Sequence, residues 1–313
     1  MTEQCASTAS ASVAAPVDPL QRPIIVIGSA RSGTTVLAKL LSQHPDVHYE
    51  EEPRLTWRIG NDRKSDLLHR EDARPAVIRE IRARFAERVR AAGKARLLEK
   101  TPSNALRLAF IDAVMPDAIF IHILRDGVEA SLSIRDFWTK HTTGLPAKAL
   151  RKRLLEMRPS QVPHYAKEAV RRSRPKWMRS VVPPAVWGPR LPGIDAMVRE
   201  LDPLDVACLQ WKLCVERCCV EGRKLPSDRY LELWLEDLDA AALERVQRFA
   251  GLEPHPEVQR RYVERFERGR ATSRKGGASS DDLERVREWV EPTRIWLEQT
   301  SPRRSSGPAP ATD

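Results

Sequence analysis

Apolar positions along the chain form two alternating patterns, short runs and longer stretches of helical spacing. The runs at 23–27 and 118–124 are apolar and rich in β-branched residues, as in central parallel strands. Shorter runs predict strands at 96–98 and 230–233. This alternation indicates a three-layer α/β fold with a central parallel sheet flanked by helices. Helices are predicted at 34–42, 70–92, 128–138, 205–222, 239–250, 256–268 and 281–299.

Three stretches interrupt the alternation. Residues 1–21 and 301–313 are rich in small residues and proline without periodicity, so we expect disordered tails. Residues 139–203 carry many prolines and basic side chains, which predicts an inserted, partly helical basic lobe. One domain with this insertion is therefore expected over 22–300.

Composition narrows the protein class. The 313 residues have a mean hydropathy of −0.47 and contain no apolar run near the roughly 18 residues of a membrane span. No secretory signal is visible. The odd number of cysteines argues against a disulfide framework, so we expect a cytoplasmic protein without a transmembrane segment. Buried free thiols are expected at Cys208, Cys214, Cys218 and Cys219.

Positive charge is concentrated in one segment. The formal net charge is +10, and residues 138–190 alone hold thirteen Lys or Arg against two acidic residues. This favours acidic partners, namely an anionic substrate, a membrane surface or nucleic acid, and a location peripheral to the membrane, although a solvated Arg-rich surface is an equal alternative. Aromatic residues, at 6%, are too sparse for a single-strand platform, so no nucleic-acid partner is expected.

A glycine-rich loop follows the first predicted strand, with the sequence Gly28-Ser-Ala-Arg-Ser-Gly-Thr-Thr35. Glycines five positions apart allow backbone N–H groups to approach an anion, and the next helix adds its N-terminal donors. The expected domain is therefore P-loop-like. The loop departs from the Walker A pattern because Thr34 replaces the lysine, and Arg31 is its cation.

Two further motifs follow predicted strands. Lys100 comes just after 96–98, and Arg125 just after 118–124, with Ser133 eight residues later. Because the carboxyl ends of parallel strands meet at one edge, Arg31, Lys100 and Arg125 should converge there. These cations predict a pocket for a ligand with more than one anionic group.

Together these motifs resemble the 3′-phosphoadenylyl sulfate (PAPS) dependent sulfotransferases, strongly over 22–138 and weakly over 205–295. The resemblance implies that Arg125 and Ser133 hold the 3′-phosphate of the donor. It also implies nucleotide contacts from Arg274 and Lys275. The 5′-phosphosulfate would lie against Gly28, Arg31, Ser32, Gly33, Thr34 and Thr35.

The stretch from His44 to Arg54, His-Pro-Asp-Val-His-Tyr-Glu-Glu-Glu-Pro-Arg, resembles the bacterial and tyrosylprotein branch. That branch has its glutamate base eight residues after the histidine, which implies Glu52, and its sulfuryl-contacting lysine matches Lys100. We expect the neighbouring glutamates to raise the pKa of Glu52. His44 and His48 are alternative bases. One departure is Leu235, where many family members carry a tyrosine.

The resemblance implies a transferase that moves a sulfuryl group from PAPS to an acceptor hydroxyl of a carbohydrate, lipid, or other small alcohol or phenol. In-line transfer would use Glu52 as general base, with Lys100 and Arg31 neutralising the sulfonate. No metal is expected. One alternative is a P-loop kinase or other phosphotransferase, which predicts ATP binding with magnesium. Another is a non-enzymatic polyanion-binding protein, which predicts steeply salt-dependent binding.

Overall fold

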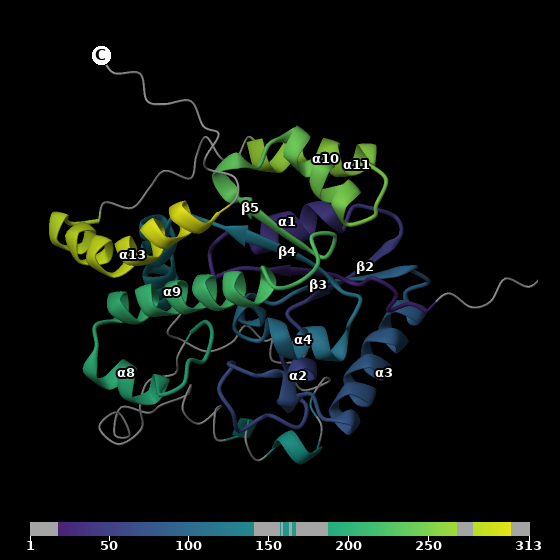
Figure 1. Ribbon diagram of the computed structural model, residues 1–313, viewed down its shortest axis with the longest axis horizontal. Coiled ribbons are helices and arrows are strands. Elements are labelled where there is room, and N and C mark those ends of the chain that lie inside the picture. Colours follow the sequence, from purple (N-terminus) through teal and green to yellow (C-terminus); the bar gives the residue numbers. More distant parts are fainter. Residues whose placement is uncertain are drawn as a thin grey trace, which may run out of the picture.

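The computed structural model describes residues 18–140, 157, 159–162, 165–166, 187–267 and 278–301. Its centre is a five-stranded sheet in the order β2-β3-β1-β4-β5, and every neighbouring pair is parallel (Figure 1). This confirms the predicted parallel sheet. The strands are β1 (Ile24–Ile27), β2 (Val47–Glu51), β3 (Arg96–Lys100), β4 (Ile119–Leu124) and β5 (Tyr230–Trp234).

Helices cover both faces of the sheet. On one face lie α1 (Thr34–Leu41), α10 (Ala240–Phe249) and α11 (Pro256–Arg261), packed on Ile24 and Val26 of β1. The other face carries α3 (Pro75–Ala91), α4 (Leu108–Val114) and α9 (Pro203–Gly222). Because alternate residues of a strand point to opposite faces, both faces of β1 are buried, which explains its unbroken apolar run.

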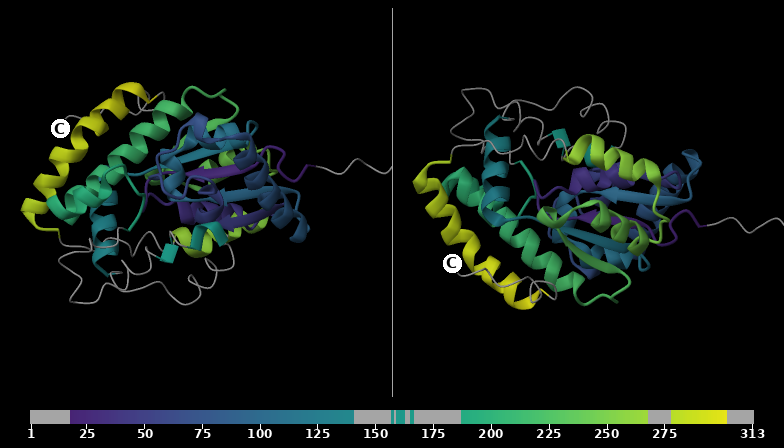
Figure 2. Two further views of the ribbon diagram at one scale, coloured as in Figure 1. Left: turned by 90° about the horizontal axis from the view of Figure 1, so that it is seen from below. Right: turned by 90° about the horizontal axis from the view of Figure 1, so that it is seen from above.

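The remaining helices extend this framework. Two of them, α5 (Gly127–Lys140) and α13 (Ser280–Thr300), pack against α9 beside the sheet (Figure 2). Short helices are α2 (Arg54–Trp57) and α8 (Ile194–Glu200), with 3₁₀ turns at 70–72, 102–106, 159–161 and 235–237. Among the described residues, no helix is both long and apolar enough to cross a membrane.

The structure corrects several predicted boundaries. The helix predicted over 70–92 begins at Pro75, which fits the first turn because proline lacks an N–H that would need a partner. The helix predicted over 256–268 changes to π geometry at Tyr262. The strand predicted at 96–98 continues to Lys100. Leu20, assigned to the N-terminal tail, is buried in the core at 2% exposure.

Strand β2 was missed entirely. Its sequence is Val-His-Tyr-Glu-Glu, and Val47 is its one buried residue. Because β2 is the edge strand next to β3, its other side chains stay partly exposed and need not be apolar. The sequence therefore offered no hydrophobic run. The stretch that was predicted to carry the base thus includes a strand that bears Glu50 and Glu51.

Some predictions fall outside the described residues. Arg274 and Lys275 are among them, as are most of the basic lobe and most of both predicted tails. Within the span assigned to the lobe, the structure describes residues 139–140, 157, 159–162, 165–166 and 187–203, and the last of these ranges includes α8.

Candidate active site

The loop from Gly28 to Gly33 joins β1 to α1 at the carboxyl edge of the sheet. Gly28 has φ +156°, and a Cβ there would lie 2.4 Å from the carbonyl oxygen of Ile123. Gly33 has φ +91°, and its Cβ would lie 2.7 Å from a methyl carbon of Leu235. Both positions therefore require glycine on conformational and steric grounds. The side chain of Leu235, which stands where many members of the resembled family carry a tyrosine, packs against this end of the loop.

The N-terminus of α1 opens toward the same edge. The N-cap residue of α1 is Gly33, which has no side chain that could accept hydrogen bonds from the first N–H groups of the helix. Thr34 is buried and Thr35 half-buried in the first turn. The Ser32 hydroxyl is turned inward and donates to the Ser29 carbonyl at 2.6 Å, which fixes the loop. Such a helix start attracts an anion.

On the β4 side of the site, which we define as Arg31, Arg125 and Ser133, two guanidinium groups lie close together. Arg31 donates from Nε to the Ser133 hydroxyl at 3.0 Å, and Arg125 donates to the Arg31 carbonyl at 2.9 Å. Ser133, which the resemblance pairs with Arg125, is thus hydrogen-bonded to Arg31. Burial, and then the charge of Arg125, lower the pKa of Arg31.

Only some of the hydrogen-bond donors of the Arg125 guanidinium have partners. Its Nη2 reaches the exposed Glu129 carboxylate at 2.7 Å, whereas its buried Nε has no partner within the described part of the chain. An unpaired buried donor is costly, so this geometry suits an added acceptor such as a phosphate oxygen. Asp126 caps α5 by accepting from the Glu129 N–H at 2.9 Å, as expected for a structural residue.

On the β3 side of the site, which we define as Glu52, Arg54 and Lys100, opposite charges are paired. Lys100 donates to Glu52 Oε1 at 2.8 Å, and Arg54 donates to Glu52 Oε2 from Nη2 at 2.7 Å and from Nε at 3.1 Å. The Lys100 side chain is 1% exposed and that of Glu52 33% exposed. The sequence identified Glu52 and Lys100 but assigned no role to Arg54.

The expected rise in the pKa of Glu52 is wrong. Burial does raise it, but Arg54 and Lys100 outweigh burial and lower the pKa to about 2. The neighbouring glutamates are themselves close to cations. Glu50 pairs with Arg88 at 3.2 Å, and Glu51 lies 3.9 Å from both Lys39 and Lys100.

Glu99 was also missed. It precedes Lys100 on β3 and is fully buried, where it accepts from Thr101 Oγ1 at 2.5 Å and from Asn104 Nδ2 at 2.8 Å. Burial raises its pKa to about 7. Arg107, also buried, donates to the Asn104 side-chain oxygen at 2.9 Å. This network fixes the turn that follows Lys100.

The two sides flank the glycine loop. Strand β1 lies between β3 and β4, so the strands that bear Lys100 and Arg125 are separated by roughly 10 Å. The cations predicted to lie at one sheet edge therefore form two groups there. Lys100 lies on one side of the glycine loop, and Arg31 and Arg125 lie on the other. The alternative bases lie elsewhere: His48 pairs with Glu50 at 2.9 Å, and His44 packs on His255.

Outside the site, three titratable side chains from distant parts of the sequence lie close together. His122, Cys219 and Glu232 have potential ligand atoms within 4.8 Å of one another. The Tyr230 hydroxyl lies 2.7 Å from His122 Nδ1, and both Glu232 oxygens accept from Arg223. These contacts describe a hydrogen-bonded network beneath α9. Sequence spacing gave no sign of it.

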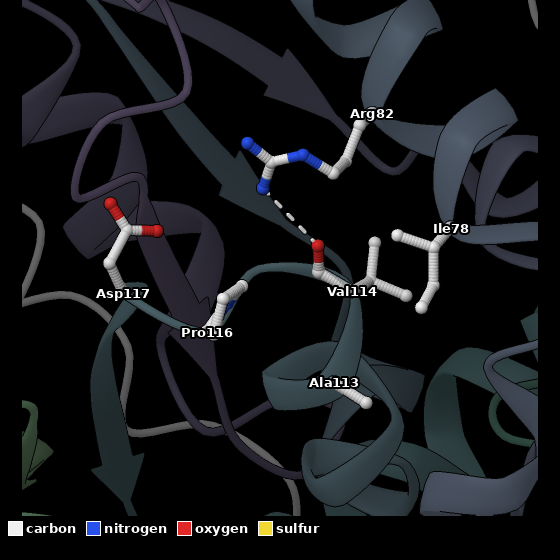
Figure 3. A pocket seen from close by; sticks show the side chains of 6 residues that line it. All are labelled: Ile78, Arg82, Ala113, Val114, Pro116 and Asp117. Atoms are coloured by element: carbon white, nitrogen blue, oxygen red, sulfur yellow. Dashed lines mark hydrogen bonds between the residues drawn. The ribbon is translucent and has the colours of Figure 1, made fainter. Parts of the chain in front are cut away.

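An open hollow of about 350 Å³ lies at the opposite edge of the sheet, between α3 and the segment before β4 (Figure 3). Arg82 in its lining donates to the Val114 carbonyl at 3.3 Å, and Asp117 accepts from the Arg22 N–H at 2.7 Å. Both polar side chains are used in hydrogen bonds to the backbone, and the hollow is remote from the glycine loop.

A family model described as the sulfotransferase family matches residues 23–187, more than half of the chain. The chain belongs to the sulfotransferase family. It is 31% identical over 140 residues to nodulation protein NoeE of Sinorhizobium fredii (strain NBRC 101917 / NGR234), an alignment that covers 39% of this chain and 33% of that protein.

A second relative is a Caenorhabditis briggsae protein provisionally named a protein-tyrosine sulfotransferase, 34% identical over 116 residues, or 33% of this chain and 39% of that protein. The chain thus aligns with between one third and two fifths of these relatives. Among solved structures, a sulfotransferase from Alicyclobacillus acidocaldarius superposes with a TM-score of 0.50 at 17% identity, covering 89% of this chain and 95% of that one. That likeness concerns the fold alone.

Proposed function

We propose that this protein transfers the sulfuryl group of PAPS to the hydroxyl of an acceptor, and that Glu52 is the general base. The observation that carries the proposal is the guanidinium of Arg125, which donates to the backbone carbonyl of Arg31 while its buried Nε lacks a partner among the described residues. A donor with a second phosphate, on its 3′-hydroxyl, would supply the acceptor atoms that this guanidinium needs.

In this proposal the chain's residues act by position and charge. The glycine loop and the N-terminus of α1 hold the 5′-phosphate, while Lys100 and Arg31 neutralise charge on the sulfonate. The acceptor oxygen bonds to sulfur as the bond from sulfur to the 5′-phosphate breaks, and the electron pair stays on the phosphate oxygen. Glu52 takes the hydroxyl proton and releases it to solvent. The products are a sulfate ester and adenosine 3′,5′-bisphosphate.

The acceptor is proposed as a class. A carbohydrate, a lipid, or another small alcohol or phenol would suit a glutamate base, and the basic segment 138–190 favours an acceptor that is anionic or bound to a membrane surface. A cytoplasmic location, peripheral to the membrane, belongs to the same proposal. No metal is needed for the charge neutralisation assigned to Lys100 and Arg31.

Thermal unfolding with nucleotides tests the donor site. At about 100 times its dissociation constant, a ligand adds about 2.7 kcal/mol, which raises the midpoint by several degrees. We expect stabilisation by adenosine 3′,5′-bisphosphate and much less by AMP, ADP or ATP with magnesium. Arg125→Ala should weaken bisphosphate binding about 30-fold, or about 2 kcal/mol, with AMP binding unchanged.

The control is Arg229→Ala, because Arg229 pairs with Asp112 away from the glycine loop. Stabilisation by ATP with magnesium instead of the bisphosphate would support the kinase alternative. Equal, salt-sensitive stabilisation by unrelated polyanions would support polyanion binding.

A further inference from the structure

Arg54 contacts the proposed base more extensively than any other described side chain. Its Nη2 and Nε both donate to Glu52 Oε2, at 2.7 and 3.1 Å, whereas Lys100 makes one bond to Oε1. Two N–H groups of one guanidinium that converge on the same oxygen fix the position of that oxygen. Arg54 therefore holds Glu52 Oε2 in place, while Lys100 contacts Oε1.

The backbone at Glu52 needs such support. Glu52 has φ +52°, in the left-handed region that non-glycine residues rarely adopt. Its N–H donates to the Lys100 carbonyl at 2.9 Å, and its own carbonyl accepts from the Arg54 N–H at 2.7 Å. A strained conformation persists where its surroundings hold it, and Arg54 holds this one through both its backbone and its side chain.

The charges around Arg54 favour its cationic form. Burial lowers its pKa, but Glu52 and then Asp66 outweigh burial and raise it. Asp66 is in turn held by Arg58 at 3.0 Å and by the backbone N–H of Arg190 at 2.8 Å. Arg54 therefore stays charged, with Glu52 as its direct partner and Asp66 as a second favourable charge.

We infer that Arg54 is the positioning residue of the site: it holds Glu52 Oε2 and leaves Oε1, the oxygen beside Lys100, as the atom that accepts the hydroxyl proton. The inference rests on the proposed function, which makes Glu52 the base. It assigns Arg54 no direct contact with the acceptor.

The test is a titration of glutamate carboxyl groups by ¹³C NMR in the full-length protein, with the Glu52 signal assigned by its loss in Glu52→Gln. In the wild-type protein this signal should stay ionised down to the lowest pH at which the protein is folded. In Arg54→Ala its midpoint should rise by at least about 1 pH unit, because an adjacent cation lowers a carboxyl pKa by roughly 1–3 units. Arg54→Lys keeps the charge without the double hydrogen bond and should give an intermediate midpoint.

Arg88→Ala is the matched control, since Arg88 pairs with the neighbouring Glu50. It should leave the midpoint of Glu52 unchanged. An unchanged Glu52 signal in Arg54→Ala, or an equal shift in Arg88→Ala, would overturn the inference. Binding of adenosine 3′,5′-bisphosphate by each variant checks the fold. If the wild-type protein fails to bind it, the proposed function fails while the titration still decides what Arg54 does.

Discussion

The two sides of the site handle charge in opposite ways. On the β3 side, the Glu52 carboxylate is paired with Lys100 through Oε1 and with Arg54 through Oε2. On the β4 side, Arg31 and Arg125 lie together, and Arg125 pairs with a carboxylate, Glu129, that is 64% exposed. An exposed pair contributes little, so the β4 side has an excess of positive charge that an anionic ligand can satisfy. The comparison indicates that ligand binding should depend on the β4 side, and pH sensitivity on the β3 side.

Glu52→Gln gives the largest expected effect. Loss of a general base should reduce turnover by about 10²–10⁴-fold, whereas binding of adenosine 3′,5′-bisphosphate should persist because the β4 side is intact. Turnover is measured as release of the bisphosphate from PAPS with the candidate alcohols and phenols. Equal loss of bisphosphate binding would mean that the two sides are not separable.

Glu52 of the β3 side and the neighbouring Glu99 should each set a pH limit on stability, with a slope of at most about 1.4 kcal/mol per pH unit. Glu52 has a pKa lowered to about 2, so the stability it contributes is present above its ordinary value of 4.5 and is lost as the pH falls toward 2. Glu99 has a pKa raised to about 7, so its contribution is full below 4.5 and is lost as the pH rises through 7.

Denaturant unfolding between pH 4.5 and 8 checks the Glu99 limit. Glu99→Gln should remove the decline in stability over that range, with the slope being informative even if the absolute stability falls. Asp117→Asn, at the opposite edge of the sheet, is the control and should keep the wild-type slope. If the decline in stability persisted in Glu99→Gln, the titration of another group would be its cause.

Ser133→Ala gives the smallest expected effect. It removes the hydroxyl that accepts from Arg31 Nε, and should weaken bisphosphate binding about 5-fold, or roughly 1 kcal/mol, without changing the titration of Glu52. Calorimetric titration measures the change. Ser42→Ala, in the cap of α1 away from the loop, should leave the affinity unchanged. If Ser133→Ala weakened binding as much as Arg125→Ala, the hydroxyl would be the main phosphate contact.

Most of the fold followed from local sequence signals. Strand β1 is buried on both faces, so its residues had to be apolar, and the glycines that follow were recognisable because their φ values and close contacts exclude other residues. Strand β2 gave no such signal because an edge strand tolerates polar side chains. The placement of Arg31, Lys100 and Arg125 at one edge followed from the parallel direction of the strands, which all end on the same side.

The sequence by itself determined the parallel sheet, the glycine loop and which charged residues would stand at its carboxyl edge, because these depend on residues near one another in the chain. Only the tertiary structure decided how those charges pair. Lys100 reaches Glu52 across 48 positions and Arg31 reaches Ser133 across 102. The pKa of Glu52 is a balance between burial and the cations that folding brings to it, so even its direction could not be read from the neighbouring glutamates.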